Sequence, residues 1–197
     1  MAPKRSGAGR PQQVTDDQIF DALAQAITED GPTNFTMNKI AARLGVTGPA
    51  LGYRFGSKHG LLSAFAARQP SATYERLSAV AGSAASPTEA IVDGLAGLVA
   101  PETTRAGVAN NLALLYIDLT DDDFGVHAAA QAKVIRRFIQ TLVAEIGLDE
   151  AGQARVTDEI YITWNGVITS WAIDGDGTLD DAIRSRLTRI LSRSATA

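Results

Sequence analysis

Apolar residues recur every three to four positions along most of the chain, which is the spacing of one face of an α-helix. Thr15 can cap the first helix, with Asp16 and Asp17 at its positively polarised start and Gly31 after its end. Its apolar stripe comprises Ile19, Phe20, Leu23, Ala26 and Ile27. No convincing stretch alternates apolar and polar residues as a half-buried strand would. The pattern therefore predicts an all-α protein.

Residues 44–62, LGVTGPALGYRFGSKHGLL, combine regularly placed apolar residues with several glycines and one proline. Gly45 follows a short helix that Thr36 can cap, because glycine readily adopts the left-handed conformation that closes a helix. Thr47 can cap the next helix, with Pro49 in its first turn, where no helical hydrogen bond is lost. The breakers thus separate short helices. A helix, a tight turn and a second helix form a helix-turn-helix, whose second helix enters the DNA major groove.

The rest of the chain shows further helical stripes. Pro70 is expected to kink or interrupt the fourth helix, which begins at Lys58. Later stripes lie within residues 87–99, 112–119, 134–146, 156–171 and 183–191. We expect three parts: a basic arm over residues 1–14, a helix-turn-helix domain over residues 15–68 and a helical C-terminal domain over residues 69–197.

Charge is distributed unevenly along the chain. The net charge is −4, yet residues 1–68 carry +3 and the remainder carries −7. Residues 31–74 contain no acid and five basic residues, namely Lys39, Arg43, Arg54, Lys58 and Arg68. Lys39 and Arg43 are four residues apart and share an outer helix face. A polyanion would be attracted to this region, and a merely solvated basic face is the alternative.

Composition argues against several classes of function. The chain has no cysteine and only two histidines, so it lacks the material for a thiolate metal site or a common nucleophile–base pair. We expect no catalysis, metal or cofactor. Residues 1–13 lack the apolar segment of a signal peptide, and no later segment is long and apolar enough for a membrane span. The expected location is the cytoplasm.

The segment Phe35–Phe65, FTMNKIAARLGVTGPALGYRFGSKHGLLSAF, resembles the DNA-binding domain of TetR-family bacterial transcription regulators. The likeness covers about 50 residues. It implies that Thr36 contacts a phosphate, that Tyr53 and Lys58 hold the DNA backbone, and that four residues face base edges. Those four are Thr47, Gly48, Pro49 and Ala50.

Two positions depart from the family pattern, and both are expected on the DNA-facing side. The family usually has tyrosine where Gly52 stands, and histidine or tyrosine where Arg54 stands. Gly52 removes a side chain that commonly contacts DNA and costs about 1 kcal/mol of helix stability relative to alanine. Arg54 either contacts a phosphate or packs on the domain surface. The arm with Arg5 and Arg10 either reaches a minor groove or has no such role.

The resemblance also implies a C-terminal domain that dimerises and binds an effector. Interface candidates are the apolar residues Trp171, Ile183, Leu187, Ile190 and Leu191, for which an internal core is the competing interpretation. Effector-contact candidates are polar or aromatic residues among apolar ones: Asn110, Asn111, Tyr116, His127, Tyr161, Trp164 and Asn165. They suit a largely hydrophobic small molecule, although each also fits a purely structural role.

Together these features predict a homodimeric, ligand-responsive regulator, expected to be a repressor, on a near-palindromic double-stranded DNA operator. The alternatives are an activator or a non-transcriptional DNA-binding factor of the same fold. A helical small-molecule carrier without DNA activity is the alternative from another class.

Overall fold

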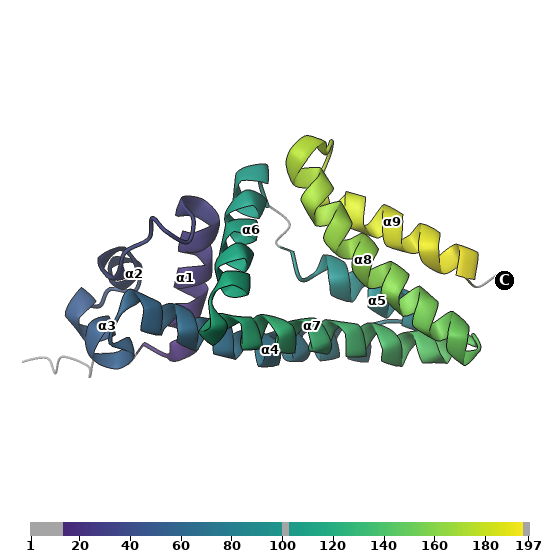
Figure 1. The fold of residues 1–197 in the computed structure, drawn as a ribbon, viewed down its shortest axis with the longest axis horizontal. Coiled ribbons are helices and arrows are strands. Elements are labelled where there is room, and N and C mark those ends of the chain that lie inside the picture. Colours follow the sequence, from purple (N-terminus) through teal and green to yellow (C-terminus); the bar gives the residue numbers. More distant parts are fainter. Residues whose placement is uncertain (1–13, 100–102, 195–197) are drawn as a thin grey trace, which may run out of the picture.

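The computed structural model describes residues 14–99 and 103–194, which form α-helices and one short 3₁₀ turn and contain no strand. This confirms the all-α prediction (Figure 1). The predicted basic arm, with Lys4, Arg5 and Arg10, lies outside the described residues except for Val14.

The first four helices build an N-terminal head. They are α1 (Asp16–Asp30), α2 (Met37–Arg43), α3 (Gly48–Phe55) and the beginning of α4 (Lys58–Ser83). Each starts at a Thr or Ser whose side-chain oxygen accepts a hydrogen bond from a backbone N–H three residues later; these caps are Thr15, Thr36, Thr47 and Ser57. Such caps satisfy N–H groups that have no partner inside the helix. The local sequence signals therefore set the helix starts.

Glycine is required at the α3–α4 corner. Gly56 ends α3 with a φ of 77°, a conformation that residues with a Cβ rarely adopt. A Cβ at Gly60 would lie 2.1 Å from the Phe55 carbonyl oxygen. The two helices can meet this closely only because both positions lack a side chain.

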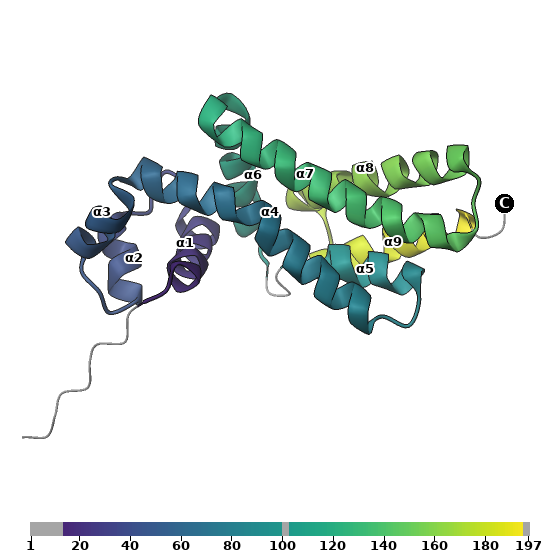
Figure 2. The same cartoon turned by 90° about the horizontal axis from the view of Figure 1, so that it is seen from below.

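Helix α4 connects the head to a C-terminal body (Figure 2). A kink or an interruption was expected at Pro70. This proline lies inside α4 and does not interrupt it. A proline removes one backbone donor, and α4 packs along α7 (Asp122–Val143), which supports the helix on either side of Pro70. The expected boundary between residues 68 and 69 falls within this continuous helix.

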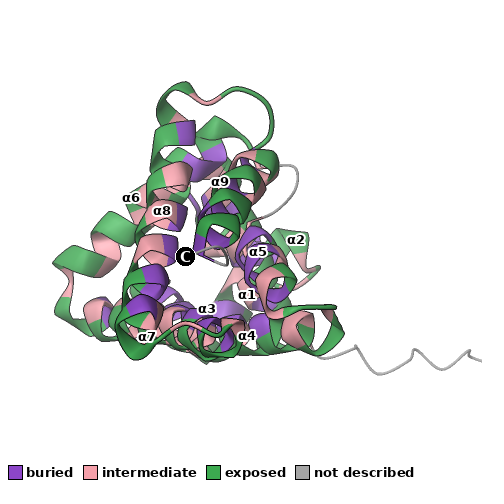
Figure 3. Ribbon diagram, turned by 90° about the vertical axis from the view of Figure 1, so that its right-hand side faces the viewer, coloured by how far each residue is buried: buried purple, intermediate pink, exposed green. Residues whose placement is uncertain are grey.

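The body consists of α5 (Pro87–Ala96), α6 (Arg105–Thr120), α7, the 3₁₀ turn Ala144–Ile146, α8 (Glu150–Asp174) and α9 (Leu179–Ser194). Apolar residues, mostly from α5, α7, α8 and α9, form its core, and Figure 3 colours the buried residues of the chain purple. The fully buried members include Ile91, Leu95, Ile139, Ile160 and Ile183.

The residues predicted for the dimer interface lie inside one chain. Trp171, Ile183, Leu187, Ile190 and Leu191 are all buried within the core of a single chain. At most 7% of any of these side chains is exposed, which matches the competing interpretation of an internal core. Periodicity identified the apolar faces of α8 and α9 correctly, but those faces pack within the body of the same chain.

Candidate DNA-binding surface and effector cavity

Helix α3 presents a small, uncharged outer surface. Leu51 anchors the helix in the head core, whereas Thr47, Pro49 and Ala50 are exposed at its start. Tyr53 is 96% exposed, so its ring has almost no contact within the chain. An aromatic ring that projects into water from a cap-anchored helix is a group available to a partner.

The beginning of α3 also packs closely on α2. A Cβ at Gly48 would lie 1.8 Å from the Asn38 Oδ1 atom, so the absence of a side chain lets α2 and α3 approach each other here. Thr36 and Thr47 are exposed, and their hydroxyl oxygens accept the N–H groups of Lys39 and Ala50. Both threonines therefore have a structural role as helix caps.

The cations near α2 and α3 are engaged within the chain. The Lys39 ammonium lies 3.1 Å from the Asp30 carboxylate, and Arg43 pairs with Glu29. The side chains of both pairs are partly exposed to solvent. The segment that lacks acids in sequence thus receives them in space from the end of α1.

Arg54 and Lys58 also have intramolecular partners. Arg54 donates to the Val14 carbonyl oxygen at 2.7 Å and lies 2.8 Å from Asp16, which matches the expected alternative of packing on the domain. The Lys58 ammonium donates to the Thr33 carbonyl oxygen at 2.7 Å and lies over the Phe35 ring. Burial lowers the pKa of Lys58. A phosphate contact by Lys58 stays a prediction, and it would require this side chain to leave Thr33.

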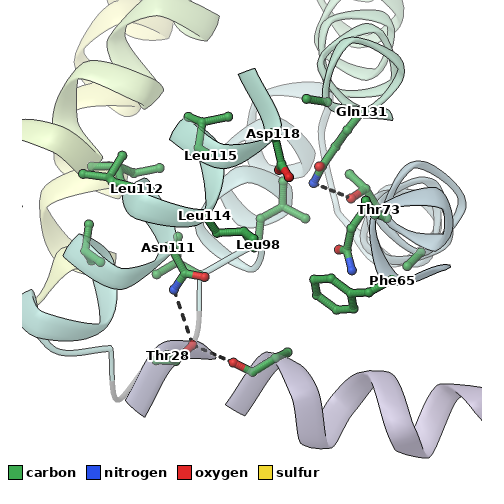
Figure 4. Close-up of a pocket in the computed structure, with 18 of the residues that line it drawn as sticks. Thr28, Phe65, Thr73, Leu98, Asn111, Leu112, Leu114, Leu115, Asp118 and Gln131 are labelled. Carbon is green, nitrogen blue, oxygen red and sulfur yellow. Dashed lines mark hydrogen bonds between the residues drawn. The ribbon is translucent and has the colours of Figure 1, made fainter. Parts of the chain in front are cut away.

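A cavity of about 1230 Å³ lies where the head meets the body, between α1, α4, α6, α7 and α8. Its walls combine apolar side chains such as Leu98, Leu112 and Leu115 with nearly as many polar ones, among them Asp118 and Gln131 (Figure 4). Concave sites lined by apolar side chains, with polar groups that orient a ligand, are typical of small-molecule binding.

Four of the predicted effector residues line this cavity: Asn111, Tyr161, Trp164 and Asn165. The side-chain polar groups of Asn111, Trp164 and Asn165 already have partners. The Trp164 indole N–H donates to the Leu95 carbonyl oxygen at 3.1 Å, and the Asn165 amide donates to the Tyr161 carbonyl oxygen at 2.9 Å.

The other three candidates do not line this cavity, and an effector contact by them stays a prediction. The Asn110 amide donates to the Thr28 carbonyl oxygen at 2.9 Å, which joins α6 to α1. Tyr116 is exposed, and His127 lies on α7 outside the lining. Each was a polar or aromatic residue in an apolar helix, and that pattern does not tell which side of the helix faces a cavity.

Asp118, which was not among the predicted residues, lies in the cavity wall (Figure 4). Its pKa is raised to about 6, mainly by burial. His127 lowers the pKa by a smaller amount, and Asp121 raises it slightly further. Its carboxylate forms no hydrogen bond or ion pair with any residue that the structure describes. A single acid within the apolar run Leu112–Leu119 was the signal that could have identified it.

Within the described ranges, no group of His and acidic residues has the arrangement of a metal site, and no helix has the length and apolarity to cross a bilayer.

The head matches a known family. Residues 19–65 match the family described as bacterial regulatory proteins, tetR family. The N-terminal domain is therefore similar to the N-terminal domain of TetR-family regulators. The matched segment extends from α1 through α2 and α3 into α4, so it includes every head residue predicted to contact DNA.

Solved structures extend the likeness over the C-terminal helices. A TetR transcriptional regulator from Legionella pneumophila has 17% identity and a TM-score of 0.72, covering 91% of this chain and 98% of its own. A transcriptional regulator from Saccharomonospora viridis in complex with choline has 17% identity and a TM-score of 0.73, covering 90% and 95%. The ketosteroid transcriptional regulator KstR2 of Mycobacterium tuberculosis has 17% identity and a TM-score of 0.57, covering 92% and 96%. The whole chain therefore has a TetR-type fold. No curated protein sequence matches it significantly.

The TetR-type head and the body share a joint at the corner between α6 and α7. Phe124, in the first turn of α7, is 2% exposed and packs into the hydrophobic cluster of the head. Its ring centroid lies 4.9 Å from that of His59 in α4. The Asn111 amide donates to the Thr28 hydroxyl of α1 at 3.4 Å. The elements that line the cavity thus also support the head.

Proposed function

We propose that this protein is a homodimeric transcriptional regulator, a repressor in the simplest case, that binds a near-palindromic DNA operator and is released by a small molecule. The observation that carries the proposal is the free outer face of α3 on a TetR-family head, with Tyr53 projecting from it. Helix-turn-helix proteins use the equivalent face to read base edges in the major groove. The proposed place of action is the cytoplasm.

The paired cations are compatible with DNA binding. Exposed ion pairs contribute only about 0–1 kcal/mol, so phosphate oxygens can replace Asp30 and Glu29 as partners of Lys39 and Arg43 at little cost. We expect DNA affinity to fall steeply with salt, because each phosphate contact releases about one counterion. The ion pairs would also weaken binding to DNA that lacks the operator, since the cations then have an alternative partner.

The proposed dimer interface uses the outward face of α8. Ile162 is 64% exposed and Ile173 is 74% exposed, and with Gly166 and Ser170 they recur at helical spacing along one side. Exposed isoleucines separated by small residues suit the close approach of an identical helix from a second copy. Two heads about 34–36 Å apart would then reach successive major grooves on one side of the duplex.

Effector control would act through the joint between head and body. A ligand in the cavity contacts α4, α6 and α7, and Phe124 links the last two helices to the head core. To release DNA, the ligand must bind the arrangement that does not fit the operator more tightly than the one that does. The Saccharomonospora viridis structure contains choline, which supports a small-molecule ligand for this fold.

The direct test is selection of bound sequences from a random DNA pool by the purified full-length protein. A palindrome with half-sites about one helical turn apart would support both the activity and the dimer. Tyr53→Ala is expected to weaken binding to the selected site by about tenfold or more. Tyr74→Ala is the matched control, because Tyr74 is also an exposed tyrosine but lies on α4 away from α3, and it should bind as the wild type does. Absence of any selected sequence, with no salt-dependent DNA binding, would refute the proposal and favour a carrier.

A further inference from the structure

We propose that the cavity at the head–body joint takes a cationic, largely apolar ligand whose charge pairs with Asp118. The inference deepens the proposed function by naming the chemical class of the effector. It rests on the position and environment of one carboxylate.

Asp118 differs from the other acids around the cavity. Asp17 and Glu75 both pair with Arg68, and Glu29 pairs with Arg43. Asp21 has no such partner but lies on an exposed part of α1. Asp118 is half-buried, and within the described chain it has neither a hydrogen-bond donor nor an ion-pair partner. A partly desolvated carboxylate without a partner is energetically costly, and a cation supplied by a ligand would remove that cost.

The cavity wall as a whole also favours a cation. Five acids line it, against two basic residues, Arg68 and Arg76. Arg68 is occupied by Asp17 and Glu75, and Arg76 lies exposed on α4. An anion would therefore meet net negative charge at the wall, whereas a cation would be attracted to it.

The remaining surroundings of Asp118 define the rest of the ligand. Leu98 and Leu114 face the same space, and Gln131 is engaged with the Thr73 hydroxyl at 3.2 Å (Figure 4). The Gln131 amide is thus engaged, and the two leucines offer no polar group to a ligand beside Asp118. The arrangement therefore suits a compact apolar body that carries one amine or ammonium group.

Three probes with the same apolar cage and different charge test this proposal: 1-adamantanamine, 1-adamantanol and 1-adamantanecarboxylate. Their affinities for the full-length protein are measured at neutral pH by calorimetry, with tryptophan fluorescence as a second readout because Trp164 lines the cavity. We expect the amine, which is protonated at this pH, to bind about tenfold or more tightly than the alcohol, and the carboxylate to bind most weakly. Equal binding of amine and alcohol, or no binding of any probe, would overturn the proposal.

Variants connect the preference to the residue. Asp118→Asn keeps the shape of the side chain and should reduce the amine-to-alcohol ratio to about one. Asp118→Glu retains the charge and should retain a preference for the amine. Asp122→Asn is the matched control, since this acid lies nearby in α7 but outside the cavity lining, and it should leave the ratio unchanged. An amine preference that persists in a folded Asp118→Asn protein would refute the assignment.

These measurements use no DNA, so they can fail independently of the proposed function. If the wild-type protein binds its operator but does not prefer the amine, only the proposed ligand class is rejected. Conversely, amine binding without DNA binding would contradict the regulator while the cation site remains.

Discussion

The hydrophobic clusters of head and body differ in how completely they are filled. In the head, short capped helices close around Leu23, Ile40 and Leu61, and at Gly60 a single Cβ would meet a backbone oxygen at 2.1 Å. Where the body meets the head, about 1230 Å³ stays open instead, lined by residues of both parts. A reading surface must hold its geometry, whereas a site that responds to a ligand needs space and groups without partners. The contrast assigns these requirements to separate parts of one chain.

The largest effect is expected where the two parts meet, at Phe124. Phe124→Ala removes a buried ring from the head cluster, which should lower the free energy of unfolding by about 3 kcal/mol. Urea denaturation followed by circular dichroism measures this. Val126→Ala is the control, because Val126 lies two residues further along α7 and is mostly exposed, and it should change stability by less than about 0.5 kcal/mol.

The same variant tests whether the joint transmits the ligand signal. With Phe124 gone, operator affinity should respond less to a cavity ligand than in the wild type, under conditions where the variant is folded. If Phe124→Ala unfolds no more readily than Val126→Ala, the head would not depend on the corner between α6 and α7, and the described coupling would be wrong.

A smaller change in stability, of opposite sign, is expected for a substitution at Asp118 in the cavity wall. Its pKa of about 6 in the folded protein exceeds the ordinary value of 3.8, so the folded state binds the proton more tightly than the unfolded state. The ionised carboxylate therefore costs stability above pH 6, and this cost disappears as the pH falls below 4. His127 and Asp121 are the charged neighbours that modify the pKa.

Asp118→Asn should thus stabilise the protein by about 1 kcal/mol at pH 8, after allowance for partial solvent screening, and by nothing measurable near pH 3.5. Denaturant unfolding at the two pH values provides the check. A gain that is equal at both would show that lost charge is not its source. A carboxylate that lowers stability and yet is present is expected where it binds a ligand.

The head could be predicted well from the sequence because its signals are local. A threonine or serine at a helix start and a glycine at its end act within a few residues, so the starts of α1 to α4 followed from short segments. The ion pairs could not be predicted in this way. Lys39 and Arg43 meet Asp30 and Glu29 only because the chain folds back on α1.

The body was harder to predict because its important contacts connect distant residues. Periodicity gave the apolar stripes that contain Trp171 and Ile183, but a stripe looks the same whether it faces the same chain or a second copy. Similarly, helical spacing cannot tell that Asn111 faces the cavity while Asn110 binds α1. The local sequence marks Asp118 only as a single acid in an apolar run, whereas its raised pKa comes from burial in the folded chain.

The smallest effect is expected at Gly52, where the otherwise tightly packed head is open. A Cβ there would meet no atom of the described chain within 4 Å, so Gly52→Ala should raise stability by about 0.5–1 kcal/mol through lower unfolded-state entropy. Gly82→Ala in α4 is equally unhindered and should give a similar gain in thermal or urea unfolding. Of the two added methyl groups, only the one at residue 52 lies on α3. If operator affinity changes for Gly52→Ala and not for Gly82→Ala, residue 52 lies against DNA. Destabilisation by Gly52→Ala would instead mean that the outer side of α3 is more crowded than its geometry indicates.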